Sequence, residues 1–245
     1  MTLGELRQEL AVLESRLKSV KLLDSDGTRA IAEAVSRISA DLAAPKSGKG
    51  KHRRHPAWRL VIRPDLPLSF VPTTNLKHQL KIDIHCDISE PTAGAPAGSH
   101  NIAVRVWALE RSLWFREAFD APPLLDRIGA SGRRVVCRFH LDLANPGQPG
   151  PRFHLQIGGN PSTNEFSWHP ATLDVPRFCH HPLNLLLTCE FIVKTFYPER
   201  YDEVADDPTW AAAVRVAQQS YLAPYFQHLN AFDESILLRR LWNRA

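Results

Sequence analysis

The sequence lacks the common signatures of catalysis and nucleotide binding. It contains no G-x-S-x-G, no Walker A loop, no G-x-G-x-x-G and no H-E-x-x-H, so the usual hydrolase, nucleotide-binding and metalloprotease motifs are missing. No apolar run is long enough to cross a bilayer, and the charged N-terminus has no apolar core of a signal peptide. These absences predict neither a cofactor nor a membrane segment.

Cysteine is scarce. The four cysteines, Cys86, Cys137, Cys179 and Cys189, have no C-x-x-C spacing, which favours a reducing, cytoplasmic setting. Cys86, Cys137 and Cys189 lie on apolar faces and are interpreted as core residues. Histidine is more frequent, but the following residues lack the short fixed spacings of zinc ligands, so no metal site is predicted: His140, His154, His169, His180, His181, Cys137 and Cys179.

Charge is nearly balanced along most of the chain. Thirty Lys and Arg residues stand against 26 Asp and Glu residues, a net charge of +4. Part of the excess lies between Lys46 and Arg54, inside a segment without large apolar residues, so residues 45–57 are predicted to be a basic, flexible linker. A general nucleic-acid surface is not supported, although Lys46–Arg54 is a local candidate for contact with phosphate.

The N-terminal segment carries the clearest periodicity in the chain. Spacings of three and four residues separate Leu3, Leu6, Leu10, Leu13, Leu17 and Val20. This is the pattern of a coiled-coil seam, and a second stripe at Ile31, Val35, Ile38 and Leu42 follows the break at residues 24–27. Residues 1–44 are therefore predicted to form a helical hairpin. The seam either packs on its own domain or binds a protein partner, including a second copy of the chain.

Residues 58–245 are predicted to form an α+β domain. Apolar and polar residues alternate over residues 80–88, 102–106, 135–143 and 153–157, which predicts an antiparallel β-meander. Residues 113–119 are a further candidate strand. Pro182 is placed at the start of a buried helix that ends before Pro198, and further helices are expected from Asp206 and from Asp233. These C-terminal helices are expected to pack on the sheet.

The polar face of the predicted sheet gathers several basic side chains. If the meander pairs in order, the residues that become cross-strand neighbours include His85, Arg105, Arg138, His140, Asp142, His154 and Gln156. Arg105, Arg138, His140 and His154 are candidates for binding a phosphate or carboxylate. The alternative is an ordinary solvated face, which is typical of antiparallel sheets.

Cys179 is the most suggestive thiol. It precedes His180, His181 and the N-terminus of the predicted buried helix, and all three features lower the pKa of a thiol. The alternative is a small packed residue between Phe178 and Pro182.

The element order, together with His169-Pro170 ten residues before Cys179, resembles the ubiquitin-conjugating (E2, UBC-like) fold. That family includes divergent bacterial versions in operons related to phage defence. The resemblance implies that Cys179 carries a thioester and that His169 is structural. Ala171 stands where the family has the Asn that stabilises the oxyanion.

Together these patterns favour a non-catalytic protein-binding or assembly subunit of a bacterial cytoplasmic complex, with its partner held by the Leu3–Val20 seam. The first alternative is an E2-like thioester carrier that uses Cys179. The second is a nucleic-acid-binding accessory protein that uses Lys46–Arg54.

Overall fold

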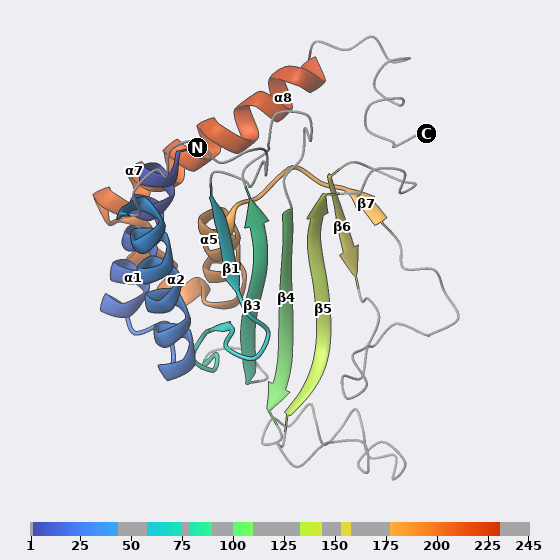
Figure 1. The fold of residues 1–245 in the computed structure, drawn as a ribbon. Helices are drawn as coiled ribbons and strands as arrows, with labels where there is room; N and C mark the ends of the chain where they lie inside the picture. Colours follow the sequence, from blue (N-terminus) through green and yellow to red (C-terminus); the bar gives the residue numbers. More distant parts are fainter. Residues whose placement is uncertain are drawn as a thin grey trace.

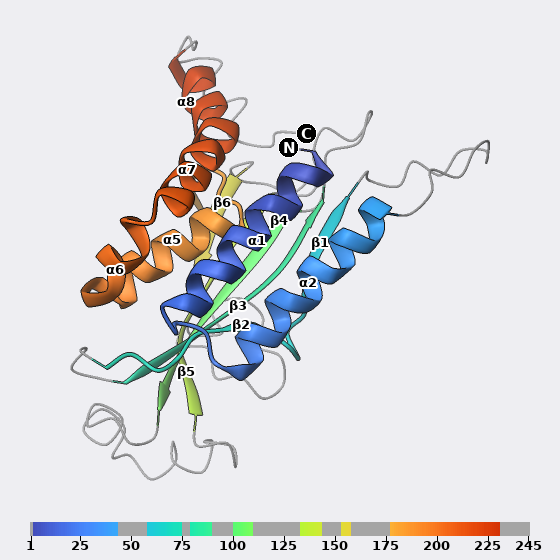
Figure 2. The same cartoon turned by 90° about the vertical axis from the view of Figure 1, so that its left-hand side faces the viewer.

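The computed structural model has the α+β fold that the sequence predicts, and it describes residues 2–43, 58–74, 79–89, 100–109, 133–143, 153–157 and 177–230. Two N-terminal helices pack against each other, an antiparallel sheet follows, and further helices close the chain (Figures 1 and 2). Among the predicted features, the basic linker at 45–57, the strand at 113–119, His169 and the helix from Asp233 lie outside the described residues.

The predicted hairpin consists of α1 (Leu3–Ser19) and α2 (Ser25–Ala43). Thr2 and Glu5 cap α1 reciprocally. The chain reverses at Lys21, whose positive φ of 54° follows the helix end. Asp24 then caps α2 by accepting a hydrogen bond from the Gly27 backbone. The break therefore ends at Asp24, and Gly27 belongs to the second helix rather than to the turn that its residue type suggested.

The sheet contains the four predicted strands and three shorter ones. The strands are β1 (Arg59–Ile62), β2 (Leu68–Ser69), β3 (Leu80–Ser89), β4 (His100–Leu109), β5 (Arg133–Leu143), β6 (Phe153–Ile157) and β7 (Arg177–Cys179). Their order is β1-β3-β4-β5-β6-β7, every pairing is antiparallel, and β2 pairs with β3. The strands that sequence analysis missed have two to four residues, too few to show a period of two.

The C-terminal helices differ from the prediction at their boundaries. They are α5 (Leu185–Phe196), α6 (Pro198–Ala205), α7 (Pro208–Ala217), the π-helix η1 (Gln218–Leu222) and α8 (Ala223–Asn230). The first begins at Leu185 rather than at Pro182, because the Asn184 side chain accepts a hydrogen bond from the Leu187 backbone. Pro224, which has no backbone N–H to donate, lies in the first turn of α8, and the π-helix ends two residues before it.

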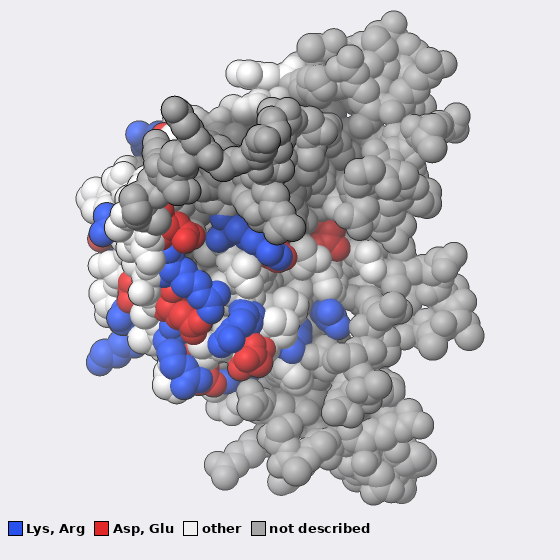
Figure 3. All heavy atoms as spheres, viewed as in Figure 1, with Lys and Arg blue, Asp and Glu red and all other residues white. Residues whose placement is uncertain are grey.

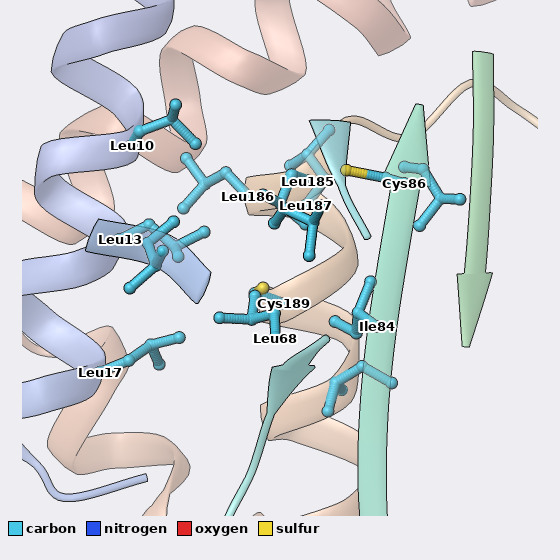
Figure 4. Close-up of a cluster of buried hydrophobic side chains, with 14 of the residues drawn as sticks. Leu10, Leu13, Leu17, Leu68, Ile84, Cys86, Leu185, Leu186, Leu187 and Cys189 are labelled. Carbon is cyan, nitrogen blue, oxygen red and sulfur yellow. The ribbon is translucent and has the colours of Figure 1, made fainter. Parts of the chain in front are cut away.

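One hydrophobic core joins the hairpin to the sheet and to α5. Leu10, Leu13 and Leu17 of α1 point toward α5, with β3 on its other side (Figure 4). Four leucines of the N-terminal seam are at most 1% exposed: Leu6, Leu10, Leu13 and Leu17. Val20 is buried as well, and Leu3 packs against the core. The seam therefore faces the chain's own core and is not a free surface for a partner, and the hairpin is not a separate arm.

Candidate functional site

The strand register brings the predicted basic residues together on one face of the sheet. Arg105 on β4 is directly opposite Arg138 on β5. His140 lies two residues farther along β5, opposite Ala103, and Asp142 pairs with His154 on β6. Residues directly opposite each other point to the same side of a sheet. All of these side chains therefore project from the face of the sheet that is opposite to the hydrophobic core.

These side chains are buried, contrary to the solvated face that is typical of antiparallel sheets. Arg105 is 8% exposed, His140 9% and His154 2%. Buried polar groups need hydrogen-bond partners. The Arg138 Nε donates to the His140 Nε2 at 2.8 Å, and the Arg105 Nη2 donates to the Pro64 carbonyl at 3.1 Å.

Asp83, which sequence analysis did not single out, joins this group. It is 3% exposed and lies opposite Arg105 across β3 and β4. Its carboxylate accepts from the Trp107 Nε1 at 2.7 Å and from the Ser69 hydroxyl at 2.6 Å. The Trp107 ring also lies 5.4 Å from the Arg105 guanidinium carbon, in cation–π range. The alternation of β3 places Asp83 on the polar face, but only the register shows that it meets Arg105.

The pKa of His85 is affected by the positive charges in this region. Burial, followed by the positive charges of Arg105 and Arg138, lowers the pKa of His85 to about 4, so its imidazole is neutral at pH 7. Two guanidinium groups on opposed strands repel each other unless negative charge lies nearby. Asp83 lies opposite Arg105 and brings one negative charge to this part of the sheet.

A second feature, which we call the apolar surface, consists of Phe139, Leu155, Ile157, Phe178 and Phe191. Phe178 on β7 is 50% exposed and Phe191 on α5 is 44% exposed. The Phe191 ring meets Phe139 edge to face, with centroids 6.1 Å apart. Phe178 lies opposite Leu155 on β6, on the side of the sheet that carries the core. The sequence predicts a buried helix here, but Phe191, Lys194 and Thr195 of α5 are exposed.

The position of the apolar surface follows from the arrangement of the helices. The helices α1, α2 and α5 gather at the β1 and β3 side of the sheet, whereas β5, β6 and β7 lie at the opposite side (Figure 1). Phe191 stands where α5 reaches β5. Apolar side chains beyond this point keep part of their area in water.

The thioester hypothesis gains little from the fold. Cys179 is the last residue of β7, with its backbone opposite His154, and His169 is not among the described residues. The first residue of α5 is Leu185, six positions after Cys179. The helix-dipole argument for a low thiol pKa was therefore wrong, because that effect is confined to the first turn.

The three other cysteines are free thiols in the interior or near it. Burial raises the pKa of Cys86 to about 12 and raises the pKa of Cys189 well above its usual value. Cys137 is half-buried, and its pKa is raised for the same reason. Thiols with raised pKa values are poor nucleophiles and metal ligands.

Charges of both signs alternate on the surface. Lys and Arg side chains lie among Asp and Glu side chains over the described residues of the face in Figure 3. Several of them pair, such as Arg59 with Asp87 and Arg63 with Asp65.

In the part of the chain that the structure describes, no three His, Cys, Asp or Glu side chains are grouped to hold a metal ion. Within the same ranges, no helix combines the length and apolar character that crossing a bilayer requires.

Comparison with protein-family models, with curated proteins and with solved structures found no match to this chain.

Proposed function

We propose that this chain is a non-catalytic protein-binding subunit that holds its partner on the apolar surface. The exposure of two phenylalanines, Phe178 and Phe191, on one side of the same sheet carries this proposal. Contiguous exposed apolar patches mark interaction sites, and large aromatic side chains supply much of the binding energy in protein interfaces.

The structure moves the proposed interface away from the N-terminal seam. A partner that bound Leu10 or Leu13 would have to open the core, since both side chains are fully buried. Binding at Phe178 and Phe191 needs no such opening. The free thiols Cys86, Cys137 and Cys189 support the cytoplasmic setting that forms part of this proposal. The bacterial and antiviral-defence setting stays an expectation from the E2-like resemblance.

The proposal is tested by exchanging one exposed aromatic side chain for a small polar one. Phe191→Ser is expected to abolish partner binding while the fold remains intact, because the Phe191 side chain is 44% exposed and lies at the margin of the core. Proteins that co-purify with the tagged chain from its source cells are quantified by mass spectrometry for both forms.

Leu42→Ser is the matched control. Leu42 is 48% exposed, similar to Phe191, but lies on α2. The proposal requires at least one protein that Phe191→Ser loses and Leu42→Ser retains. Identical co-purification profiles for the two variants would remove it.

A second candidate function is the binding of a small anion between Arg105 and Arg138. The opposition of two arginines across β4 and β5 favours it. Inorganic phosphate is then expected to raise the melting temperature of the protein, and Arg138→Gln is expected to remove that rise. An equal rise in the variant would show that phosphate acts without this arginine pair.

A further inference from the structure

A cavity of about 190 Å³ lies between α1 and the helical segment formed by α7 and η1. One stripe of α1 and one stripe of the opposing segment form its walls. The residues that line it and enter the argument are Glu5, Glu9, Ala213, Val216, Ser220 and Tyr221. At the other end of this helix pair Arg16 forms a salt bridge with Asp207 at 3.5 Å. This salt bridge holds the two helical segments together at one end, and the cavity lies toward the other end.

Small side chains and the π-helix shape the cavity. Ala213 and Ser220 leave the wall of α7 and η1 open where larger residues would fill it. Ser220 and Tyr221 belong to the π-helix, whose extra residue per turn changes which side chains face α1. Such π-helical turns occur frequently at functional sites. An engineered cavity of roughly 150 Å³ holds a benzene molecule, so this one has room for a four-carbon chain.

Glu9 places a carboxylate in this cavity. The Asn184 side chain donates to the Glu9 Oε2 at 2.8 Å, and the Leu186 backbone also hydrogen-bonds the carboxylate. Asn184 is 2% exposed and caps α5, so it holds Glu9 in a fixed position. A carboxylate offers about four acceptor sites, and these two donors leave capacity for another.

The carboxylate lacks a cationic partner among the residues that the structure describes. Burial raises the pKa of Glu9 to about 7 despite the hydrogen bonds from Asn184 and Leu186. Glu5 adds a second acidic group at the cavity wall, and its pKa is lowered by hydrogen bonds from Thr2. Negative charge thus collects beside apolar walls with an aromatic ring, Tyr221, within the lining.

We propose that this cavity binds an alkyl-ammonium group, with the ammonium on Glu9 and the alkyl chain between Ala213 and Val216. An ammonium supplies the positive charge that a buried carboxylate lacks. Tyr221 lines the same cavity, and aromatic rings attract cations. This site is distinct from the apolar surface and does not depend on the proposed function.

The pH dependence of binding is part of the inference. The titratable groups near Glu9 are Glu5 on the same helix, Tyr221 on η1 and Cys189 on α5. Tyr221 and Cys189 have pKa values raised by burial and stay neutral at pH 8, and Glu5 is already ionised at pH 5.5 because its pKa is lowered. An alkylamine keeps its charge until about pH 10. Affinity is therefore expected to rise between pH 5.5 and pH 8 as Glu9 loses its proton.

The test is a titration of the full chain with n-butylamine, followed through the NMR signals of the cavity alanines and valines. At pH 8 n-butylamine is expected to saturate and to bind about tenfold or more tightly than n-butanol, which has the same chain without the charge. Equal binding of the two compounds, or shifts that do not saturate, would overturn the proposal.

Two variants separate the carboxylate from the cavity. Glu9→Gln keeps an acceptor for Asn184 and is expected to weaken n-butylamine about tenfold or more and to remove its pH dependence. Ala213→Leu fills the cavity and is expected to abolish binding, whereas Ala211→Leu, the same change outside the lining, is expected to retain it. Retained binding in Ala213→Leu would place the amine elsewhere.

A second ligand distinguishes two sources of the ammonium group. N-acetyl-lysine N-methylamide presents the same chain and charge as a lysine within a protein. Binding at least as tight as that of n-butylamine assigns the cavity to a lysine of a partner protein. Binding of n-butylamine alone assigns it to a free alkylamine, and binding of neither overturns the proposal.

Discussion

At the scale of single residues, polar side chains in the interior decide what this fold tolerates. Asp83, Glu9 and Asn184 are each held by a hydrogen bond to another element. Removal of one member leaves its partner buried without a hydrogen bond, which typically costs about 1–3 kcal/mol. These residues consequently influence stability more than their small number suggests.

Glu9 is expected to make stability fall as the pH rises. Its pKa is about 7 in the folded chain, against the ordinary glutamate value of 4.5, so the folded state holds the proton more tightly. The resulting stabilisation is complete below pH 4.5 and is lost as the pH rises through about 7. Glu9→Gln should therefore stabilise the protein relative to the wild type at pH 8, by on the order of 2 kcal/mol, and show no advantage at pH 4.

Urea unfolding of both forms at pH 4, 6 and 8 measures this difference. If the free energies of unfolding of the two forms differ by the same amount at all three pH values, Glu9 does not titrate between pH 4 and pH 8.

Gly27 is expected to resist replacement by any larger residue. A Cβ added there would lie 2.0 Å from the Ser69 carbonyl oxygen, where α2 crosses β2. The new Cβ would be attached to the backbone of α2, and the atoms it meets belong to the backbone of β2, so neither can rotate away from the clash. Gly27→Ala should therefore lower the free energy of unfolding by about 3 kcal/mol. Gly4→Ala is the control: its Cβ would meet only Thr2 Oγ1 at 4.0 Å, and the helix should gain up to about 1 kcal/mol. Thermal unfolding of the two variants compares them directly, and equal melting temperatures would contradict the close contact.

At the scale of elements, the N-terminal hairpin is an integral part of the fold. Deletion of residues 1–56 removes several large core side chains, among them Leu10, Leu13, Leu17 and Ile31. Each contributes about 1.5–3 kcal/mol through burial. Their summed contribution is comparable to the whole net stability of an ordinary domain. We expect residues 57–245 alone not to fold, as judged by amide dispersion in an NMR spectrum. A well-dispersed spectrum of the fragment would show that the hairpin is a separate unit after all.

Sequence periodicity predicted the elements whose patterns span many residues. The seam of α1 and the alternation of β3 to β6 were read correctly because their apolar faces are long and continuous. The short strands β1 and β7, the helix start at Leu185 and the π-helix depend on local hydrogen bonds or tertiary pairing. The spacing of apolar residues along the sequence does not reveal such features.

The candidate sites were less accessible to sequence reasoning than the fold. Alternation alone placed Arg105 and Arg138 on one face, but their direct opposition follows from the register, and the burial of Arg105 follows from the tertiary structure. The seam was recognised as apolar, yet a periodic stripe does not show whether it meets the same chain or another. Glu9 looked like an ordinary helix-surface residue, because its contact with Asn184 spans 175 positions of sequence.

At the scale of the whole molecule, the core lies to one side. The hairpin and α5 cover the apolar residues of β1 and β3, and α7 packs on α1 and α5, while β5 to β7 extend beyond that cover with Phe178 exposed (Figure 1). On the polar side of the same sheet Arg105 and Asp83 are buried and Arg138 is half-buried. The molecule thus combines one stable core with an apolar area that has capacity for a partner.

The most direct test of the protein-binding account is site-specific photo-cross-linking in the source cells. A benzophenone amino acid replaces Phe178 or Phe191 in separate forms of the chain, and Leu42 in a control form. The account predicts the same protein adduct from positions 178 and 191 and no such adduct from position 42, with an adduct of twice the chain's mass identifying a second copy. No adduct from either phenylalanine position, or the same adducts from all three, would contradict it.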